Sequence, residues 1–199
     1  MNSNEGSGIE NKIGVLNNEN PLSVEQKKEL IKSAGAETVS NITVAQRDAF
    51  HKYTGTAYAN INATLRGIEK SFDFGNKENA QNLHSVLKSA SLPCESTVYR
   101  GVSSKALGTL RRLPDDKLQG KVFFDKGFLS TSLDASSAFD GDLILEIHAP
   151  IGAHGLYVGY VSSAGHYEEE VLFDVNQNMR IDSVSRDELG RRLLKVTII

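Results

Sequence analysis

The sequence predicts an α+β protein in which N-terminal helices pack on a mainly antiparallel, two-sheet core. Apolar residues recur at helical spacing from about residue 22 to 90, and after Pro93 the spacing changes to the alternation of strands. The helices come before the strands as a block and do not alternate with them, so a parallel α/β sheet is not expected. Residues 21–199 are therefore predicted to form a single domain.

The composition is that of an ordinary globular protein. Of the 199 residues, 39% are hydrophobic and 24% are charged, which suffices for one buried core. A net charge of -3 gives no broad electrostatic case for binding nucleic acid. A single cysteine excludes an internal disulfide, and no apolar run reaches the ~18 residues of a membrane span. Residues 1–20 are rich in Asn, Glu, Gly and Ser and are expected to form a flexible arm or linker.

The helical half begins at two capping residues. Ser23 precedes an apolar-periodic run and has Gln26 in the reciprocal position of a capping box, and Thr43 can cap a second helix. Pro93 ends the helical region. Two apolar stripes at helical spacing lie between, formed by Tyr58, Ile61, Leu65 and Ile68 and then by Ala80, Leu83, Leu87 and Ala90.

The strand half follows Pro93. A brief helix is predicted over 105–113, between the first two strands. The predicted strands cover residues 97–100, 121–124, 127–133, 143–147, 156–161, 169–174, 179–184 and 193–199.

Three acids enter one of these strands. Glu168, Glu169 and Glu170 run directly into an apolar segment. Strand side chains alternate between faces, so Glu168 and Glu170 are expected to share one face while Glu169 points away. Two carboxylates side by side can stabilise a developing cation and orient a basic substrate. A charge run that merely ends a strand in solvent is the other interpretation.

Two further motifs precede the acids. Arg100 lies late in a strand and is followed by Gly101, so it can present a fork of donors to a phosphate while the backbone turns closely beneath. In the segment 128–132, alternation puts Ser130 and Ser132 on one face and Thr131 on the other. Hydroxyls on an inner strand can hold a neighbouring carboxylate by hydrogen bonds.

Taken in order, these motifs resemble the mono-ADP-ribosyltransferases of bacterial toxins and effectors, in the class with an Arg, a Ser-Thr-Ser and a Glu-x-Glu motif. The resemblance is to the catalytic domains of actin-modifying binary toxins and to type III effector transferases. It covers most of residues 45 to 185. It includes the helical stretch 53–66, which is similar to the helix before the catalytic core, the Ala138-Phe139 pair and the segment 155–157.

The resemblance implies a reaction in which ADP-ribose moves from NAD+ to a protein side chain and nicotinamide is released. Glu170 would stabilise the oxocarbenium-like transition state, Ser130 would hold Glu170, and Arg100 would bind the NAD+ phosphates. Glu168 would align the acceptor and take its proton, and in this family a glutamate there goes with arginine acceptors. The other implied cofactor-binding residues are Gly101, Thr131, Ser132 and Phe139.

The loop before the acids corresponds to the family's acceptor-recognition loop, where relatives place an aromatic residue. Tyr167 and His166 are the candidates here. No second ligand lies at a metal-binding spacing from His166, so we expect no metal. The sequence departs from the family at residues 139–142, which are acidic where some relatives carry a second basic residue. The grip on the cofactor must then come from elsewhere, or the affinity for NAD+ is modest.

Other functions stay open on the residues alone. A glycosidase also uses two carboxylates, and same-face strand positions lie ~7 Å apart, which fits its geometry. The absence of tryptophan and the presence of Arg100 count against it. A plain NAD glycohydrolase would use water in place of the acceptor, and a non-catalytic interaction module would keep only the fold.

The resemblance also implies a biological setting. The protein would be a secreted or injected toxin or effector that acts in the host cytosol on a host protein, with actin as the first candidate. It would belong to a larger toxin polypeptide or be delivered by a separate translocation component.

Overall fold

The computed structural model describes residues 21–68, 74–138 and 140–199, so the predicted arm at residues 1–20 lies outside it. Helices come first and strands second, as predicted. The helical elements are α2 (Val24–Ser40), α3 (Val44–Lys52), the π-helical turn η1 (Tyr53–Ala57), α4 (Tyr58–Arg66) and α5 (Phe74–Leu87), followed by the short 3₁₀ helices η2 (Ser104–Arg112), η3 (Asp115–Lys117) and η4 (Ala135–Ser137). None of the helices within the described residues is long and apolar enough to cross a membrane.

Local sequence explains where α2 and α3 begin. The hydroxyls of Ser23 and Thr43 accept hydrogen bonds from the backbone N–H groups of Gln26 and Gln46, each at 3.2 Å. Each glutamine side chain in turn accepts from the N–H of its capping residue at 2.8 Å. Both helices therefore start with a complete capping box, and each cap contributes about 0.5–2 kcal/mol.

The first predicted apolar stripe is wrong at its ends. Ile61 is fully buried, but Tyr58 is 49% exposed and Ile68 is 70% exposed. Gly67, with a φ of 71°, closes α4 in the left-handed conformation, so Ile68 lies beyond the helix. The second stripe is buried throughout, although α5 ends at Leu87, three residues before the stripe does.

The strands form one hydrogen-bonded sheet in the order β2-β7-β8-β4-β1-β3-β6-β5. Within the described residues only β4 and β8 pair in parallel, and the other neighbours are antiparallel. The strands are β1 (Ser96–Val102), β2 (Val122–Asp125), β3 (Leu129–Ser132), β4 (Leu143–Ala149), β5 (Gly155–Tyr157), β6 (Glu170–Phe173), β7 (Gln177–Arg186) and β8 (Arg192–Ile198).

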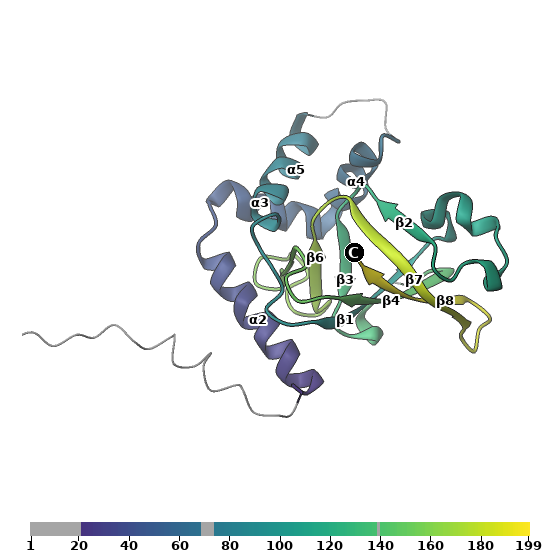
Figure 1. Ribbon diagram of the computed structural model, residues 1–199. Coiled ribbons are helices and arrows are strands. Elements are labelled where there is room, and N and C mark those ends of the chain that lie inside the picture. The colour runs from purple at the N-terminus through teal and green to yellow at the C-terminus, as the bar shows by residue number, and fades with distance from the viewer. Residues whose placement is uncertain (1–20, 69–73, 139) are drawn as a thin grey trace, which may run out of the picture.

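The predicted α+β class with a mainly antiparallel core is confirmed, and the two expected sheets are joined at one point. A single register pair, Tyr99 with Ser132, connects β1 to β3. In Figure 1, β3 and β6 run steeply while β1 and β4 run across the view, so the strands divide into two differently oriented groups. The junction places the arginine strand β1 beside the hydroxyl strand β3.

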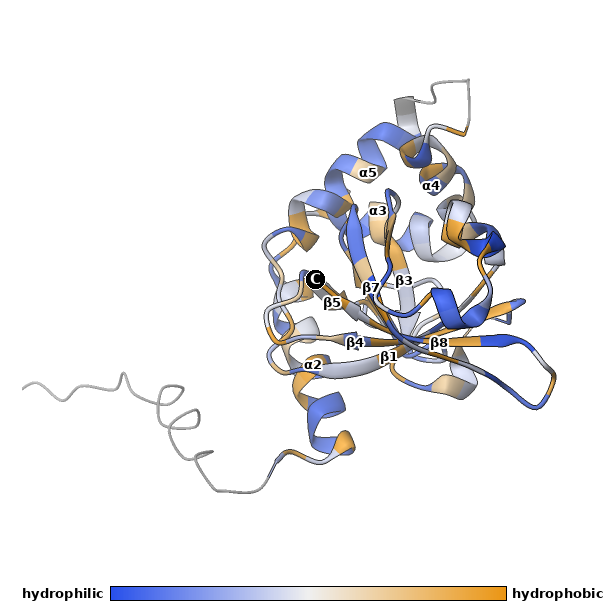
Figure 2. Cartoon of the chain, turned by 45° about the vertical axis from the view of Figure 1, so that its right-hand side comes forward, coloured by the Kyte–Doolittle hydropathy of each residue, from blue (hydrophilic) through white to orange (hydrophobic). Residues whose placement is uncertain are grey.

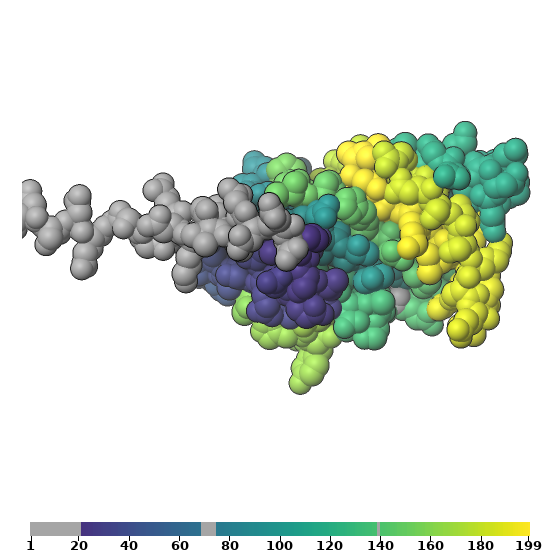
Figure 3. Space-filling model, turned by 60° about the horizontal axis from the view of Figure 1, so that its bottom comes forward, coloured from purple at the N-terminus to yellow at the C-terminus, as the bar shows by residue number. Residues whose placement is uncertain are grey.

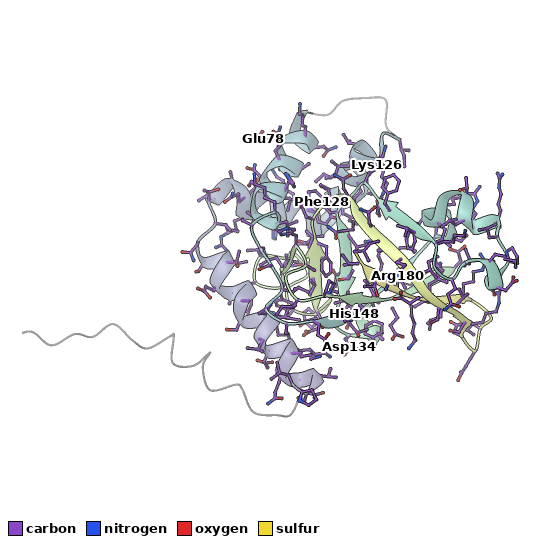
Figure 4. The ribbon with its side chains drawn as sticks, in the orientation of Figure 1. Glu78, Lys126, Phe128, Asp134, His148 and Arg180 are labelled. Atoms are coloured by element: carbon purple, nitrogen blue, oxygen red, sulfur yellow. The ribbon has the colours of Figure 1, made fainter. Side chains whose placement is uncertain are left out.

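Two apolar cores flank the central strands. On the helical side, Phe128 and Leu172 pack with buried residues of α3, α4 and α5. On the other side, Val171 and Phe173 pack with β1, β4, β7 and β8. Figure 2 shows blue and orange segments along α2 and α5, as expected for helices with one exposed and one buried face, and Figure 4 shows Phe128 between the helices and the strands. The strand face that carries Phe128 and Leu172 therefore looks toward the helices.

Candidate active site

The hydroxyl run and the last acid lie on neighbouring antiparallel strands. In the register of β3 with β6, Ser130 pairs with Leu172 and Ser132 pairs with Glu170. Ser130 shares the helix-facing side with Phe128, as the predicted alternation requires. Across the diagonal, Ser130 Oγ donates to Glu170 Oε1 at 2.6 Å. This length is typical of a hydroxyl bonded to a carboxylate, so Ser130 fixes the orientation of Glu170.

Glu170 is a buried carboxyl with one unused oxygen. The residue is 3% exposed, and Oε2 has no hydrogen-bond partner among the described atoms. Burial raises the pKa of Glu170 to about 7, against the opposing effects of the Ser130 hydrogen bond and the Arg100 charge, while Glu168 adds to the increase. A buried polar atom without a partner is costly in a folded protein. Oε2 is therefore positioned to accept a hydrogen bond from a ligand.

Arg100 lies near the end of β1 and reaches across to β3. Its Nη1 donates to the backbone carbonyl of Ser130 at 2.8 Å, and burial lowers the pKa of its guanidinium. Arg100, Gly101 and Glu170 line one cavity. Arg100 is the one basic residue among the described residues that line this cavity, so it is the cationic partner available there to an anionic group.

Glu168 reaches the site by a turn, and the prediction that strand alternation places it there is wrong. The strand β6 begins at Glu170, because Glu169 has a φ of 47°, which lies outside the extended region. The Glu169 carboxylate pairs with Lys32 of α2 at 2.8 Å, whereas Glu168 lines the same cavity as Glu170. Burial raises the pKa of Glu168 as well. The two acids thus face one cavity, and the residue between them points elsewhere.

Two adjoining cavities of about 560 and 630 Å3 form what we call the cleft; they share Arg100, Gly101 and Asp140. The first lies between the two acids and the helical wall of η1 and α4. The second is lined by three more basic side chains, Arg66, Lys105 and Lys126. Volumes of this size are typical of ligand sites, and the two together suit an extended anionic ligand.

The helical wall was missed as part of the site. Tyr53, Tyr58 and Asn62 line the first cavity. Asn62 is buried, donates to the Tyr53 hydroxyl at 2.9 Å and accepts from the backbone N–H of Phe128 at 2.9 Å, so it fastens α4 to the start of β3. In the sequence, the polar Asn62 beside the apolar stripe of this helix was the signal that could have indicated the wall. The π-helical turn η1, a feature frequent at functional sites, could not be read from the sequence.

Thr131 and Ser132 line a smaller pocket together with Arg100 and the two acids of the cleft. Thr131 is buried and its hydroxyl donates to the Val171 carbonyl at 2.7 Å, while Ser132 Oγ accepts from the Asp134 N–H at 3.1 Å. Tyr167 is 92% exposed on the loop before β6. The predicted roles of all three stay predictions, and Phe139 lies outside the described residues.

His166 belongs to an aromatic cluster at the base of that loop. Its Nδ1 lies 2.9 Å from the hydroxyl of Tyr157, and its ring contacts Tyr160 edge-on with centroids 4.8 Å apart. Tyr157 is fully buried, as expected for a packing residue. His166 therefore supports the loop, and its predicted contact with an acceptor stays a prediction.

A third cavity of about 370 Å3 lies between α2 and β1, away from these residues. Its charges are largely paired, with Lys27 bonded to Glu95 at 3.1 Å. Asp134 and His148, which also line it, lie at the bottom of Figure 4. Across residues 21–68, 74–138 and 140–199, no group of three or more His, Cys, Asp or Glu side chains is arranged to hold a metal ion.

Comparison with known proteins points to one family. A family model described as ADP-ribosyltransferase exoenzyme matches residues 26–198. The Photox toxin of Photorhabdus laumondii is 28% identical over 176 aligned residues, which cover 75% of this chain and 42% of that toxin. The chain thus spans about two fifths of the length of this relative.

Solved structures share the fold. Plx2a, an ADP-ribosyltransferase toxin from Paenibacillus larvae, superposes with a TM-score of 0.76 at 20% identity, covering 88% of this chain and 96% of that one. The ADP-ribosylating toxin BECa of a C. perfringens binary enterotoxin, solved with NADH, gives 0.72 at 23% identity and covers 89% and 48%. The family model matches nearly the whole length of this chain, so the chain belongs to the ADP-ribosyltransferase exoenzyme family.

Proposed function

We propose that the protein transfers ADP-ribose from NAD+ to an arginine side chain of a host protein and releases nicotinamide. The observation that carries the proposal is the buried Glu170 carboxyl on the wall of the cleft, held by Ser130 at 2.6 Å, with its second oxygen buried and without a hydrogen-bond partner among the described residues. Family membership supports the transferase class. Family membership does not identify the type of acceptor side chain or the target protein, and both are part of the proposal.

Glu170 accounts for the bond-breaking step. When the C–N bond between ribose and nicotinamide breaks, both bonding electrons leave with nicotinamide, and positive charge develops on the ribose. A fixed carboxylate stabilises that cation more than the neutral ribose ring, and this difference lowers the barrier. The free Oε2 would accept the ribose 2′-hydroxyl, which supplies the partner that this buried oxygen lacks.

The cleft offers cations for the phosphates of NAD+. Arg100 lies between the two cavities, and Lys105 and Lys126 line the second. Asp140, in the acidic segment where some relatives are basic, is paired with Arg191. This pairing reduces the negative charge at the cleft. In place of the second basic residue of some relatives, Arg100, Lys105 and Lys126 would bind the phosphates of NAD+.

Glu168 supports arginine as the acceptor. A guanidinium has a pKa of about 13.8, so it is a poor nucleophile until a carboxylate aligns it and takes a proton as the new bond forms. Glu168 lines the same cavity as Glu170, which is the place where the ribose cation would form. Tyr167, fully exposed on the adjoining loop, would contact the acceptor protein.

Actin remains the first candidate target, on the resemblance of residues 167–172 to actin-modifying toxins. The test is incubation with labelled NAD+ and a eukaryotic lysate, followed by identification of the labelled protein and side chain. A labelled arginine supports the proposal, and a labelled side chain of another type contradicts the acceptor assignment. Nicotinamide release without any labelled protein would favour the alternative, a plain NAD glycohydrolase.

Loss of the Ser130 hydroxyl should slow the reaction moderately. Ser130→Ala removes one hydrogen bond to a charged group, worth about 1.5–3 kcal/mol, and leaves the Glu170 charge in place. We expect nicotinamide release to fall roughly 10- to 100-fold, measured in steady state. Ser136→Ala, at an exposed serine of η4, is the matched control and should be neutral. Unchanged kinetics with a lowered melting temperature would make Ser130 a purely structural residue.

The reaction should depend on pH through Glu170. The carboxylate must be ionised, and its pKa is about 7, so kcat/KM should fall about tenfold per pH unit below 7 and level off above it. The Ser130 hydrogen bond lowers that pKa, so the midpoint should move to higher pH in Ser130→Ala. Nicotinamide release measured from pH 5 to 9 in both proteins checks this. A flat profile would show that Glu170 does not titrate in this range.

A further inference from the structure

Glu169, between the two acids of the cleft, is held from outside by helix α2. Its φ of 47° is a conformation that costs a non-glycine residue roughly 1–3 kcal/mol. Its carboxylate oxygens lie 3.0 and 2.8 Å from Lys32 Nζ, and the side chains of both residues are about three-quarters buried. The strained residue therefore has a specific ionic partner on the side away from the cleft.

Lys32 also contacts the aromatic cluster beneath the loop 158–169. Its Nζ lies 5.7 Å from the ring centroid of Tyr157, a cation–π distance, and the Tyr157 hydroxyl bonds to His166. One ammonium group thus touches the last part of the loop and its aromatic base. Figure 3 shows the yellow-green segment that contains this loop protruding beside the purple surface of α2.

A helix-interior glycine explains how α2 comes so close. A Cβ on Gly35 would lie 2.7 Å from the carbonyl oxygen of Tyr157, so only glycine lets the helix pack here. Lys32 lies three residues before Gly35, on the same helix face. Glycine inside a helix costs about 0.5–1 kcal/mol relative to alanine. Gly35 has this cost at the position where the close packing of α2 brings Lys32 to Glu169.

Hydrogen bonds to the backbone complete the arrangement. The Glu169 carbonyl accepts from the Leu133 N–H at 2.9 Å, just after the hydroxyl strand. The Glu169 N–H donates to the His166 carbonyl at 3.2 Å. With its backbone and its side chain both fixed, Glu169 determines the direction in which the preceding residue, Glu168, leaves the chain. Glu170 is held separately, by Ser130 and by the register of β6.

We propose that Lys32 and Glu169 form a positioning clamp that aims Glu168 at the acceptor, without touching NAD+ or the acceptor. The inference rests on the proposed function, since it assumes that Glu168 serves the acceptor and Glu170 serves NAD+. Breaking the clamp should therefore impair transfer to protein and spare NAD+ hydrolysis.

The first test is Lys32→Met, which keeps the length and apolar stem of the side chain and removes its charge. We expect the kcat of protein labelling to fall about tenfold, while nicotinamide release in the absence of acceptor and the KM for NAD+ stay within about twofold. Lys28→Met is the matched control, one turn earlier on α2 and 4.0 Å from Asp134, and should leave both activities unchanged.

Two further variants test the ionic contact from the side of Glu169. Glu169→Gly permits the left-handed φ but lacks the carboxylate, so it should behave like Lys32→Met. The exchanged pair Lys32→Glu with Glu169→Lys restores the ionic contact and should recover at least part of the labelling rate. Melting temperatures measured alongside show whether each variant is folded.

The outcomes distinguish the clamp from the function on which it rests. Full labelling by a folded Lys32→Met protein, or equal loss of labelling and hydrolysis, overturns the clamp and leaves the proposed function intact. A Glu169→Gly variant with normal labelling also overturns it. A wild-type protein with neither activity overturns the proposed function and the clamp together.

Discussion

Replacement of Glu170 by glutamine is expected to abolish both ADP-ribose transfer and NAD+ hydrolysis. Glutamine has nearly the same shape and can still accept the Ser130 hydrogen bond, but it cannot stabilise the ribose cation by charge. Removing a preorganised electrostatic group typically costs about 10²–10³ in kcat. Nicotinamide release and protein labelling are measured on the same sample, and near-normal turnover by a folded variant would remove the proposed mechanism.

The same variant should be at least as stable as the wild type at pH 8. The pKa of Glu170 is raised on folding from 4.5 to about 7, so its contribution to stability is present below pH 4.5 and is lost as the pH rises through 7. Removing the carboxylate should then stabilise the protein at pH 8, by at most about 3 kcal/mol. Glu78→Gln, at the outer end of α5 in Figure 4, is the matched control and should change neither activity nor stability.

Replacement of Glu168 by glutamine is expected to separate the two activities. Hydrolysis uses water and needs Glu170, Ser130 and Arg100, so nicotinamide release should largely survive. Transfer needs the guanidinium aligned and relieved of a proton, so protein labelling should collapse. Glu168 reaches the cleft from the loop and not from β6, so the substitution leaves the strand and the Ser130–Glu170 bond in place.

The ratio of labelling to nicotinamide release is the decisive quantity for Glu168→Gln. Equal loss of the two activities would mean that Glu168 serves the NAD+ site. Loss of neither would mean that the acceptor is a side chain other than arginine. Comparison with Lys32→Met adds a further check, because both variants should lower the same ratio, with the larger effect at Glu168.

Local signals in the sequence predicted much of the fold. The caps at Ser23 and Thr43, the change of periodicity after Pro93 and the face of Ser130 on its strand all agree with the structure. Each depends on residues within a few positions of one another. The arginine, hydroxyl and glutamate motifs are each short and local too, so the motifs and their order could be recognised without coordinates.

Predictions that depended on packing or backbone strain failed. Ile68 belongs to an apolar stripe by spacing, but Gly67 ends the helix before it. Glu168 and Glu170 line one cavity with Glu169 turned away, as expected, but a left-handed turn at Glu169 places them there and strand alternation does not. The wall formed by Tyr53 and Asn62 was missed because their side chains look like part of a buried helix face until the strands are placed against them.

The sequence by itself determined the types and order of the elements, the helix caps and the identity of the chemical groups, because these depend on local spacing and on side-chain chemistry. The tertiary structure decided how the groups meet. Ser130 contacts Glu170, 40 residues away in the sequence, through the register of two strands. Lys32 contacts Glu169, 137 residues away, because α2 packs closely at a glycine. Such contacts follow from the packing of whole elements, which no local pattern encodes.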